Sequence, residues 1–252
     1  MILIVRALIG LLVLVSAMCM IAYAQSKAAP SPIVYVGLGD SITWGLSASK
    51  PCLPETARPV EFACPDATSF PAVLARALRS RGHQVQLQNL AISGARIGWV
   101  WADELGKIAP TANLITLFIG TNDFSDIAFR NTTTFDQFAR QYVSLVDYLR
   151  AVFPKARIVL LNVPNIGYLP CCNATRAAAA VTWKAGNLLI NALAGKAIVV
   201  DLVCDSALYD AAMFPSADSV HPNDAGHARI AADILATLEH PHKPAAACAP
   251  YF

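Results

Sequence analysis

The sequence predicts a single α/β domain in which a parallel β-sheet is covered by helices on both faces. Five short, mainly apolar runs alternate along the chain with segments of helical character, and this alternation is typical of βαβ units. No Pro- or Ser-rich linker interrupts the alternation after residue 32. A chain of 252 residues is also long enough to bury the core of one large α/β domain.

The predicted strands are the short apolar runs themselves. Runs of this kind are expected where a parallel sheet is buried on both faces, because neither side of the strand meets water. The five runs cover residues 33–36, 85–90, 114–119, 158–163 and 197–203.

The helices between the strands are predicted from periodicity and from their start and stop signals. A Ser or Asn cap begins a helix, Pro is tolerated in the first turn, and Gly or Pro ends it. Apolar residues that recur at steps of three and four indicate an amphipathic helix. These signals place helices from Ser69 to near Gly82, over 135–152 with a stop at Pro154, over the Ala-rich residues 174–193, and from the cap Asn223 to before Pro241.

The N-terminal segment predicts export. Residues 1–24 are apolar apart from three residues, carry one positive charge at Arg6, and end in an A-x-A pattern before Gln25. This pattern is typical of a cleaved signal peptide, so we expect a periplasmic or secreted protein; an uncleaved membrane anchor is the alternative. The expected organisation is a signal peptide over 1–24, a linker over 25–32, the domain over 33–240 and a Pro/Ala-rich tail over 241–252.

Cysteine content agrees with an oxidising compartment. Cys19 falls in the signal peptide, which leaves six of the seven cysteines in the mature chain. Six cysteines allow 15 pairings, and sequence does not choose among them. We expect Cys52 to pair with Cys64 across a Pro-rich loop, and Cys171 or Cys172 to pair with Cys204. No C-x-x-C or H-x-x-x-H spacing favours a zinc site.

Composition excludes two other classes of protein. With 56% hydrophobic and 14% charged residues, the chain is not intrinsically disordered. Nineteen Lys and Arg against 17 Asp and Glu give a net charge of +2. This charge is too small for a surface that holds a phosphate backbone, so nucleic acid is not an expected partner.

Polar residues gather where the predicted strands end. Ligands of parallel α/β sheets bind outside the carboxyl ends of the strands. The first strand leads into Gly39-Asp40-Ser41, the second into Ser93-Gly94, and the third into Asn122-Asp123; Asp218-x-x-His221 follows the fifth. A hydroxyl, N–H donors and an imidazole beside a carboxylate are the groups that acyl transfer requires.

Two other α/β motifs are incomplete. The third glycine of a dinucleotide-binding G-x-G-x-x-G that starts at Gly37 would be residue 42, which is Ile. No serine lies in the G-x-S-x-G frame of the α/β-hydrolases.

The polar motifs resemble those of the SGNH/GDSL hydrolase superfamily of serine esterases and lipases. The first block is matched by Gly39-Asp40-Ser41, with Ile42 in place of Leu, the second by Gly94, the third by Gly120-x-Asn122-Asp123, and the last by Asp218-x-x-His221. The four blocks occur in the family's order and span almost the whole predicted domain.

The resemblance implies a role for each of five residues. Ser41 is the expected nucleophile, His221 the base, and Asp218 the carboxylate that orients it. The backbone N–H groups of Ser41 and Gly94 and the side chain of Asn122 are the expected oxyanion-hole donors. Read alone, Ser41 before a helix would more often be an N-cap.

The resemblance also implies the fold and the reaction. The fold would be a three-layer α/β/α flavodoxin-like sandwich with strand order 2-1-3-4-5. The reaction would be hydrolysis of carboxylic esters, with no metal or organic cofactor. The expected partners are small-molecule, lipid or glycan esters, and a membrane only if the N-terminal segment stays uncleaved. A carbohydrate O-deacetylase, an acyltransferase and a non-catalytic binding protein on the same scaffold remain alternatives.

Residues near the motifs have less specific expectations. We expect Asp40 and Asp123 to be structural acceptors for the turns at the strand ends, and His227 to be a packing or solvated histidine. Aromatic residues close to the motifs suggest an apolar wall for an acyl or alkyl group. These aromatic residues are Trp44, Trp99, Trp101 and Phe124.

Overall fold

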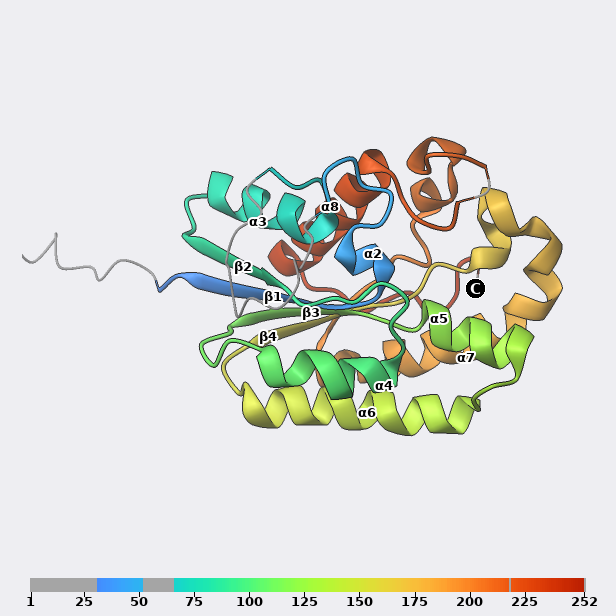
Figure 1. Cartoon of the computed structure of the whole chain (residues 1–252), viewed down its shortest axis with the longest axis horizontal. Helices are drawn as coiled ribbons and strands as arrows, with labels where there is room; N and C mark the ends of the chain where they lie inside the picture. The colour runs from blue at the N-terminus through green and yellow to red at the C-terminus, as the bar shows by residue number, and fades with distance from the viewer. Residues whose placement is uncertain (1–30, 52–65, 218, 252) are drawn as a thin grey trace, which may run out of the picture. The chain divides into compact units, whose positions relative to one another are not determined.

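A parallel sheet of five strands lies at the centre of the computed structural model, which describes residues 31–51, 66–217 and 219–251. The strand order is β2-β1-β3-β4-β5, which confirms the expected order; Figure 1 labels the first four strands. All residues of the central strand β3 are buried, as both faces of the sheet are covered. The strands are β1 (Ile33–Gly39), β2 (Val85–Asn89), β3 (Leu114–Phe118), β4 (Arg157–Leu161) and β5 (Ile198–Val200).

Helices cover both faces of the sheet (Figure 1). On one face α3 (Phe70–Ser80) packs against α8 (Asp224–Glu239), and on the other α6 (Phe135–Val152) packs against α7 (Arg176–Ala192). These three layers confirm the predicted α/β/α class. Within the described part of the chain, no helix has the length and apolarity needed to span a membrane.

Short helices follow the strands that carry the motifs. They are α2 (Ser41–Trp44) after β1, α4 (Ile97–Trp99) after β2, and α5 (Thr121–Ser125) after β3. Wider π-helical turns continue two of them, Val100–Glu104 after α4 and Asp126–Arg130 after α5.

The predicted helix ends are confirmed where a side chain forms the cap. Asn223 Oδ1 accepts hydrogen bonds from the N–H groups of Ala225 and Gly226 at 2.9 and 3.2 Å at the start of α8. The bounds of α6 agree with the periodic segment 135–152. The start of α7 was predicted too early, because Pro170–Thr175 forms a separate 3-10 segment before the helix begins.

Strand β5 is shorter than the apolar run that predicted it. Leu202 and Val203 are fully buried, but they lie beyond the last residue of the strand. The N–H of Val203 donates to Asn162 Oδ1 at 2.9 Å instead of to a neighbouring strand. The apolar residues Leu202 and Val203 are therefore buried without pairing in the sheet.

The described disulfides join Cys171 to Cys172 and Cys204 to Cys248. The expected bridge from Cys171 or Cys172 to Cys204 is therefore wrong. The segment after α8 returns to the end of β5, where the N–H of Ala245 donates to Asp201 Oδ2 at 2.8 Å. This return brings the Cys248 Cα within 5.6 Å of the Cys204 Cα.

Some predictions fall on segments outside the described residues. They are the signal peptide over 1–24, most of the linker over 25–32, and the pairing of Cys52 with Cys64. These remain predictions.

Candidate active site

Ser41 lies where β1 turns into α2. Gly39 makes this turn with φ of +141°, and a Cβ on it would lie 2.0 Å from the Phe118 carbonyl oxygen, so only glycine fits. Asp40, and not Ser41, is the N-cap of α2: its Oδ1 accepts the N–H of Ile42 at 3.0 Å. The cap interpretation of Ser41 is therefore wrong, and its hydroxyl is left for other partners.

The Ser41 hydroxyl contacts an imidazole from the other end of the chain. Ser41 Oγ lies 2.9 Å from His221 Nε2, although the two residues are 180 positions apart. His221 lies in the loop between β5 and α8, next to the cap of α8. Ser219 holds the backbone of His221 with two hydrogen bonds. Ser219 Oγ accepts the His221 N–H at 3.0 Å and donates to the His221 carbonyl at 2.9 Å.

Burial lowers the pKa of His221 from its ordinary value of 6.5. This direction is opposite to the upward shift that a neighbouring carboxylate would cause. Asp218, the carboxylate predicted to orient the imidazole, lies outside the described residues. A lowered pKa keeps the imidazole neutral near pH 7, as a proton acceptor must be.

Gly94 and Asn122 lie at the same edge of the sheet as Ser41. The segments that follow β2, β1 and β3 carry Gly94, Ser41 and Asn122, and these strands are neighbours in that order. Gly94 has φ of +83°, and a Cβ on it would meet no atom within 4 Å, so the space beside it is open. Asn122 Nδ2 donates to the Ala95 carbonyl at 2.9 Å, which joins the segments after β2 and β3. An amide nitrogen has two hydrogens, and this bond uses one of them.

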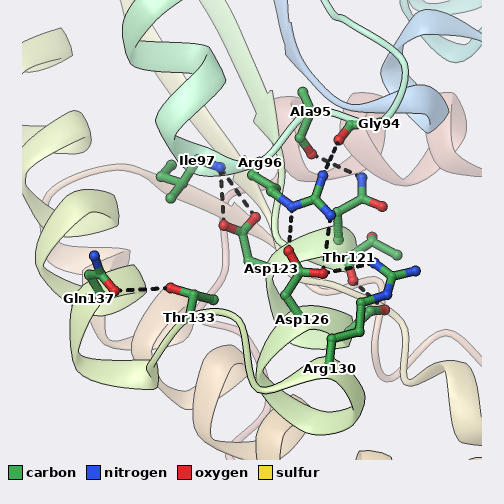
Figure 2. A network of polar contacts seen from close by, with 12 residues as sticks. Gly94, Ala95, Arg96, Ile97, Thr121, Asp123, Asp126, Arg130, Thr133 and Gln137 are labelled. Atoms are coloured by element: carbon green, nitrogen blue, oxygen red, sulfur yellow. Dashed lines mark hydrogen bonds and ion pairs between the residues drawn. The ribbon is translucent and has the colours of Figure 1, made fainter.

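Asp40 and Asp123 are confirmed as buried structural acceptors. Both oxygens of Asp123 accept the N–H of Ile97 at 3.2 Å (Figure 2). Burial raises the pKa of Asp40 to about 7 and that of Asp123 to about 6. Both carboxyl groups are therefore buried beside the motif residues Ser41 and Asn122, and each is partly protonated near its raised pKa.

Glu104 is a buried acid that the sequence analysis missed. It is fully buried, its Oε2 accepts the N–H of Gly39 at 2.9 Å, and burial raises its pKa well above the ordinary value. It thus binds the turn that presents Ser41. The available signal was its helical spacing from Ile97 and Val100, which places an acid on the apolar face of that segment.

An apolar pocket is lined by sequence neighbours of Ser41 and His221. Its walls include Ile42, which follows Ser41, as well as Val220 and Pro222, which flank His221. The remaining walls come mainly from the segments after β4 and β5, among them Val163, Ile166, Leu169, Leu208, Met213 and Phe214. A pocket of this kind suits a hydrocarbon group.

The predicted aromatic wall is wrong for Phe124. That ring is fully buried and packs edge-on against Phe138 and Trp183 at 5.1 and 5.5 Å between centroids. The three tryptophans Trp44, Trp99 and Trp101 do not line the pocket described above.

His227 is a packing histidine, which settles the choice between the two expected roles. It is fully buried, stacks on Phe70, and its Nδ1 accepts the N–H of Phe70 at 3.3 Å. Burial lowers its pKa to about 4, so the ring is neutral near pH 7. A search for metal sites among the described residues found no group of three or more His, Cys, Asp or Glu that could hold a metal ion.

Comparisons with known proteins agree with this fold. Among solved structures, the fold is similar to an extracellular lipase from Streptomyces rimosus (21% identity, 81% of this chain and 99% of that one, TM-score 0.59). It is also similar to a phospholipase A1 from Streptomyces albidoflavus NA297 (21%, 82% and 99%, TM-score 0.59). A third is an acetylxylan esterase from Geobacillus stearothermophilus (18%, 86% and 98%, TM-score 0.62). No curated protein matches the sequence. Residues 38–229 match the model of the GDSL-like lipase/acylhydrolase family, a stretch that holds Ser41, Gly94, Asn122 and His221, and the chain belongs to that family of hydrolases acting on esters.

Proposed function

We propose that the protein is an exported serine esterase or lipase that hydrolyses carboxylic esters through an acyl-enzyme. The observation that carries the proposal is the 2.9 Å contact between Ser41 Oγ and His221 Nε2 at the carboxyl edge of the sheet. A hydroxyl in contact with a neutral imidazole is the arrangement that activates a serine nucleophile.

In the first step Ser41 Oγ attacks the ester carbonyl carbon while His221 Nε2 takes the hydroxyl proton. The carbonyl becomes a tetrahedral oxyanion. The bond to the alcohol oxygen then breaks, and His221 returns the proton to the leaving alcohol. In the second step His221 takes a proton from a water molecule, whose oxygen attacks the acyl carbon. The bond between that carbon and Ser41 Oγ then breaks, His221 returns the proton to Ser41 Oγ, and the carboxylic acid leaves.

The N–H groups of Ser41 and Gly94 and the second amide hydrogen of Asn122 stabilise the oxyanion in this proposal. Open space beside Gly94 supports it, since the carbonyl oxygen of a bound ester needs room there. Loss of one such donor typically lowers kcat by about 10² to 10³-fold. We expect an effect of this size for Asn122→Ala.

The apolar pocket is the proposed acyl-binding site. Ile42, Val220 and Pro222, the sequence neighbours of Ser41 and His221, are among its walls, so we expect an acyl chain on Ser41 Oγ to extend toward it. Burial of each CH₂ contributes about 0.8 kcal/mol, which favours esters with a hydrocarbon acyl group over charged acyl groups.

The test of the nucleophile is Ser41→Ala, assayed with p-nitrophenyl butyrate and with a fluorophosphonate that labels active serines. We expect loss of hydrolysis and loss of the label. Ser80→Ala is the matched control, because Ser80 is an exposed serine near the end of α3. Wild-type hydrolysis by Ser41→Ala would exclude this mechanism.

The role of Asp218 has its own test. If it orients His221, Asp218→Asn should lower kcat strongly by freeing the imidazole to take the wrong tautomer. A variant with near wild-type kcat would instead indicate a Ser–His dyad.

A panel of acyl-chain lengths beside acetylated xylan distinguishes the substrate classes. Preference for longer p-nitrophenyl esters would support the lipase or esterase assignment. Preference for the acetylated glycan would identify a carbohydrate O-deacetylase, and product transfer to an added alcohol in place of water would identify an acyltransferase.

Export is proposed together with this activity. Disulfides persist in oxidising compartments, and the described residues contain two. Cleavage after Ala24 would give a mature protein that begins at Gln25. N-terminal sequencing of the protein from periplasm or medium tests this, and an intact N-terminus in the membrane fraction would indicate an anchor.

A further inference from the structure

The turn that carries Gly94 is anchored in the core by Ile92 and Ala95 and is closed by a hydrogen bond. The N–H of Ala95 donates to the Ile92 carbonyl at 3.0 Å, which closes a turn with Gly94 at a positive φ. Ser93 is exposed, and the space beside Gly94 is open. On this open side, the direction of the peptide groups around Gly94 therefore depends on the polar contacts made by the turn.

Arg96 supplies one of these contacts from outside the turn. Its Nη1 donates to the Gly94 carbonyl at 3.1 Å (Figure 2). The same guanidinium binds Asp126 in a fork, with Nη2 donating to Oδ1 at 3.1 Å and Nε donating to Oδ2. Asp126 is 4% exposed, so the fork is anchored to a buried carboxylate.

The anchor stays charged over a wide pH range. The hydrogen bond from Arg96 lowers the pKa of Asp126, and a second bond from Arg130 adds to this. Arg130 Nη1 lies 2.8 Å from Asp126 Oδ1, but Arg130 belongs to the turn after α5, and its contact is with Asp126 and not with the Gly94 turn. Figure 2 shows the two arginines on either side of the one carboxylate.

Further bonds join the same two segments. The Ala95 carbonyl accepts from Asn122 Nδ2, and the Ile97 N–H donates to Asp123. Residues 95–97 are thus tied at three successive positions to residues 122–126, and Figure 2 shows the bonds of Arg96 to Asp126 and of Ile97 to Asp123. The segments that bear two of the proposed oxyanion donors, Gly94 and Asn122, form one hydrogen-bonded unit.

We infer that Arg96, anchored by Asp126, is a positioning residue that holds the Gly94 turn so that the Gly94 N–H meets the developing oxyanion. The inference rests on the proposed esterase function. Arg96 acts through the turn and not on the substrate. A planar guanidinium is needed because it binds a carbonyl and both oxygens of a carboxylate at once, which an ammonium group does not reproduce.

The test compares Arg96→Ala with Arg130→Ala. Both variants remove one arginine from Asp126, so they match in charge and in loss of the ion pair. We expect Arg96→Ala to lower kcat about ten-fold or more, a fraction of the effect of removing an oxyanion donor, with KM changed less than about two-fold. Arg130→Ala should keep wild-type kcat.

A transition-state analogue gives a readout that a general loss of stability does not move. A trifluoromethyl ketone forms a hemiketal oxyanion on the serine. Its inhibition constant should rise in Arg96→Ala by the same factor by which kcat/KM falls. Arg96→Lys retains the charge and should show a partial loss; it replaces the alanine variant if that variant does not fold.

Several results would overturn the inference. They are wild-type kcat in Arg96→Ala or Arg96→Lys, an equal loss in Arg130→Ala, and an unchanged inhibition constant beside a lowered kcat. Ser41→Ala separates this failure from failure of the proposed function: an active Ser41→Ala enzyme excludes the esterase mechanism itself, whereas an inactive one leaves the Arg96 results to decide.

Discussion

Replacing Asp40 by asparagine should stabilise the protein above neutral pH and leave its stability nearly unchanged at pH 4. Asp40 is 1% exposed, and its Oδ1 accepts the N–H of Ile42 at 3.0 Å at the start of α2. Asparagine retains this acceptor and the shape of the side chain. It has no ionised form, and so it avoids placing a charge in this buried site.

The magnitude follows from the pKa of Asp40, which burial raises from 3.8 to about 7. The folded protein binds this proton more tightly than the unfolded chain. The stabilisation is therefore complete below pH 3.8 and is lost as the pH rises to about 7. This interval corresponds to about 4 kcal/mol, at 1.36 kcal/mol for each pH unit. The asparagine of the variant does not titrate and loses nothing over the same interval, so the variant should gain up to this amount over the wild type at pH 8.

Urea unfolding at pH 4, 6 and 8, followed by circular dichroism, measures the difference. Asp123→Asn is the matched comparison, because burial raises the pKa of Asp123 only to about 6. Asp123→Asn should gain about 3 kcal/mol in free energy of unfolding over the wild type, and this gain should be complete at a lower pH than that of Asp40→Asn. A difference between Asp40→Asn and wild type that is the same at all three pH values would refute the reasoning.

Three further predictions concern pH, a disulfide and packing. Because burial lowers the pKa of His221 from 6.5, kcat/KM should rise with pH to a plateau with a midpoint below 6.5; a pH–rate profile with a higher midpoint would contradict this. Replacing both Cys204 and Cys248 by serine opens a loop with a sequence separation of 44 and should lower the free energy of unfolding by about 4 kcal/mol. A urea midpoint equal to that of the wild type would show that the disulfide does not stabilise the fold. In Gly186→Ala the new Cβ would lie 2.0 Å from Phe124 Cζ, so the variant should be destabilised by about 1 to 3 kcal/mol, seen as a lower Tm; an unchanged Tm would mean that the ring moves freely.

Sequence patterns predicted the features that depend on neighbouring residues. The bounds of α6 followed from apolar residues three and four positions apart, and the start of α8 from Asn223, whose side chain caps its own helix. The sheet order was implied by the motifs of the family. Parallel strands end at one edge, and so Ser41, Gly94, Asn122 and His221 could be placed together from the chain alone.

Other features depend on which distant segments meet, and sequence carries no signal for that. Cys204 pairs with Cys248 because the last residues return to the end of β5. Phe124 follows a motif residue yet is enclosed in the core by two other rings.

The sequence by itself thus determined the class of fold, most of its elements and the residues proposed for ester hydrolysis. These features follow from local periodicity and from short motifs. Only the tertiary structure decided how the site is supported. Glu104 binds the Gly39 turn from 65 positions away, and Arg96 binds Asp126 from 30 positions away. An acid within a helix or an arginine just before one is ordinarily a solvated surface residue, and its role appears only when folding brings its partner within hydrogen-bond distance.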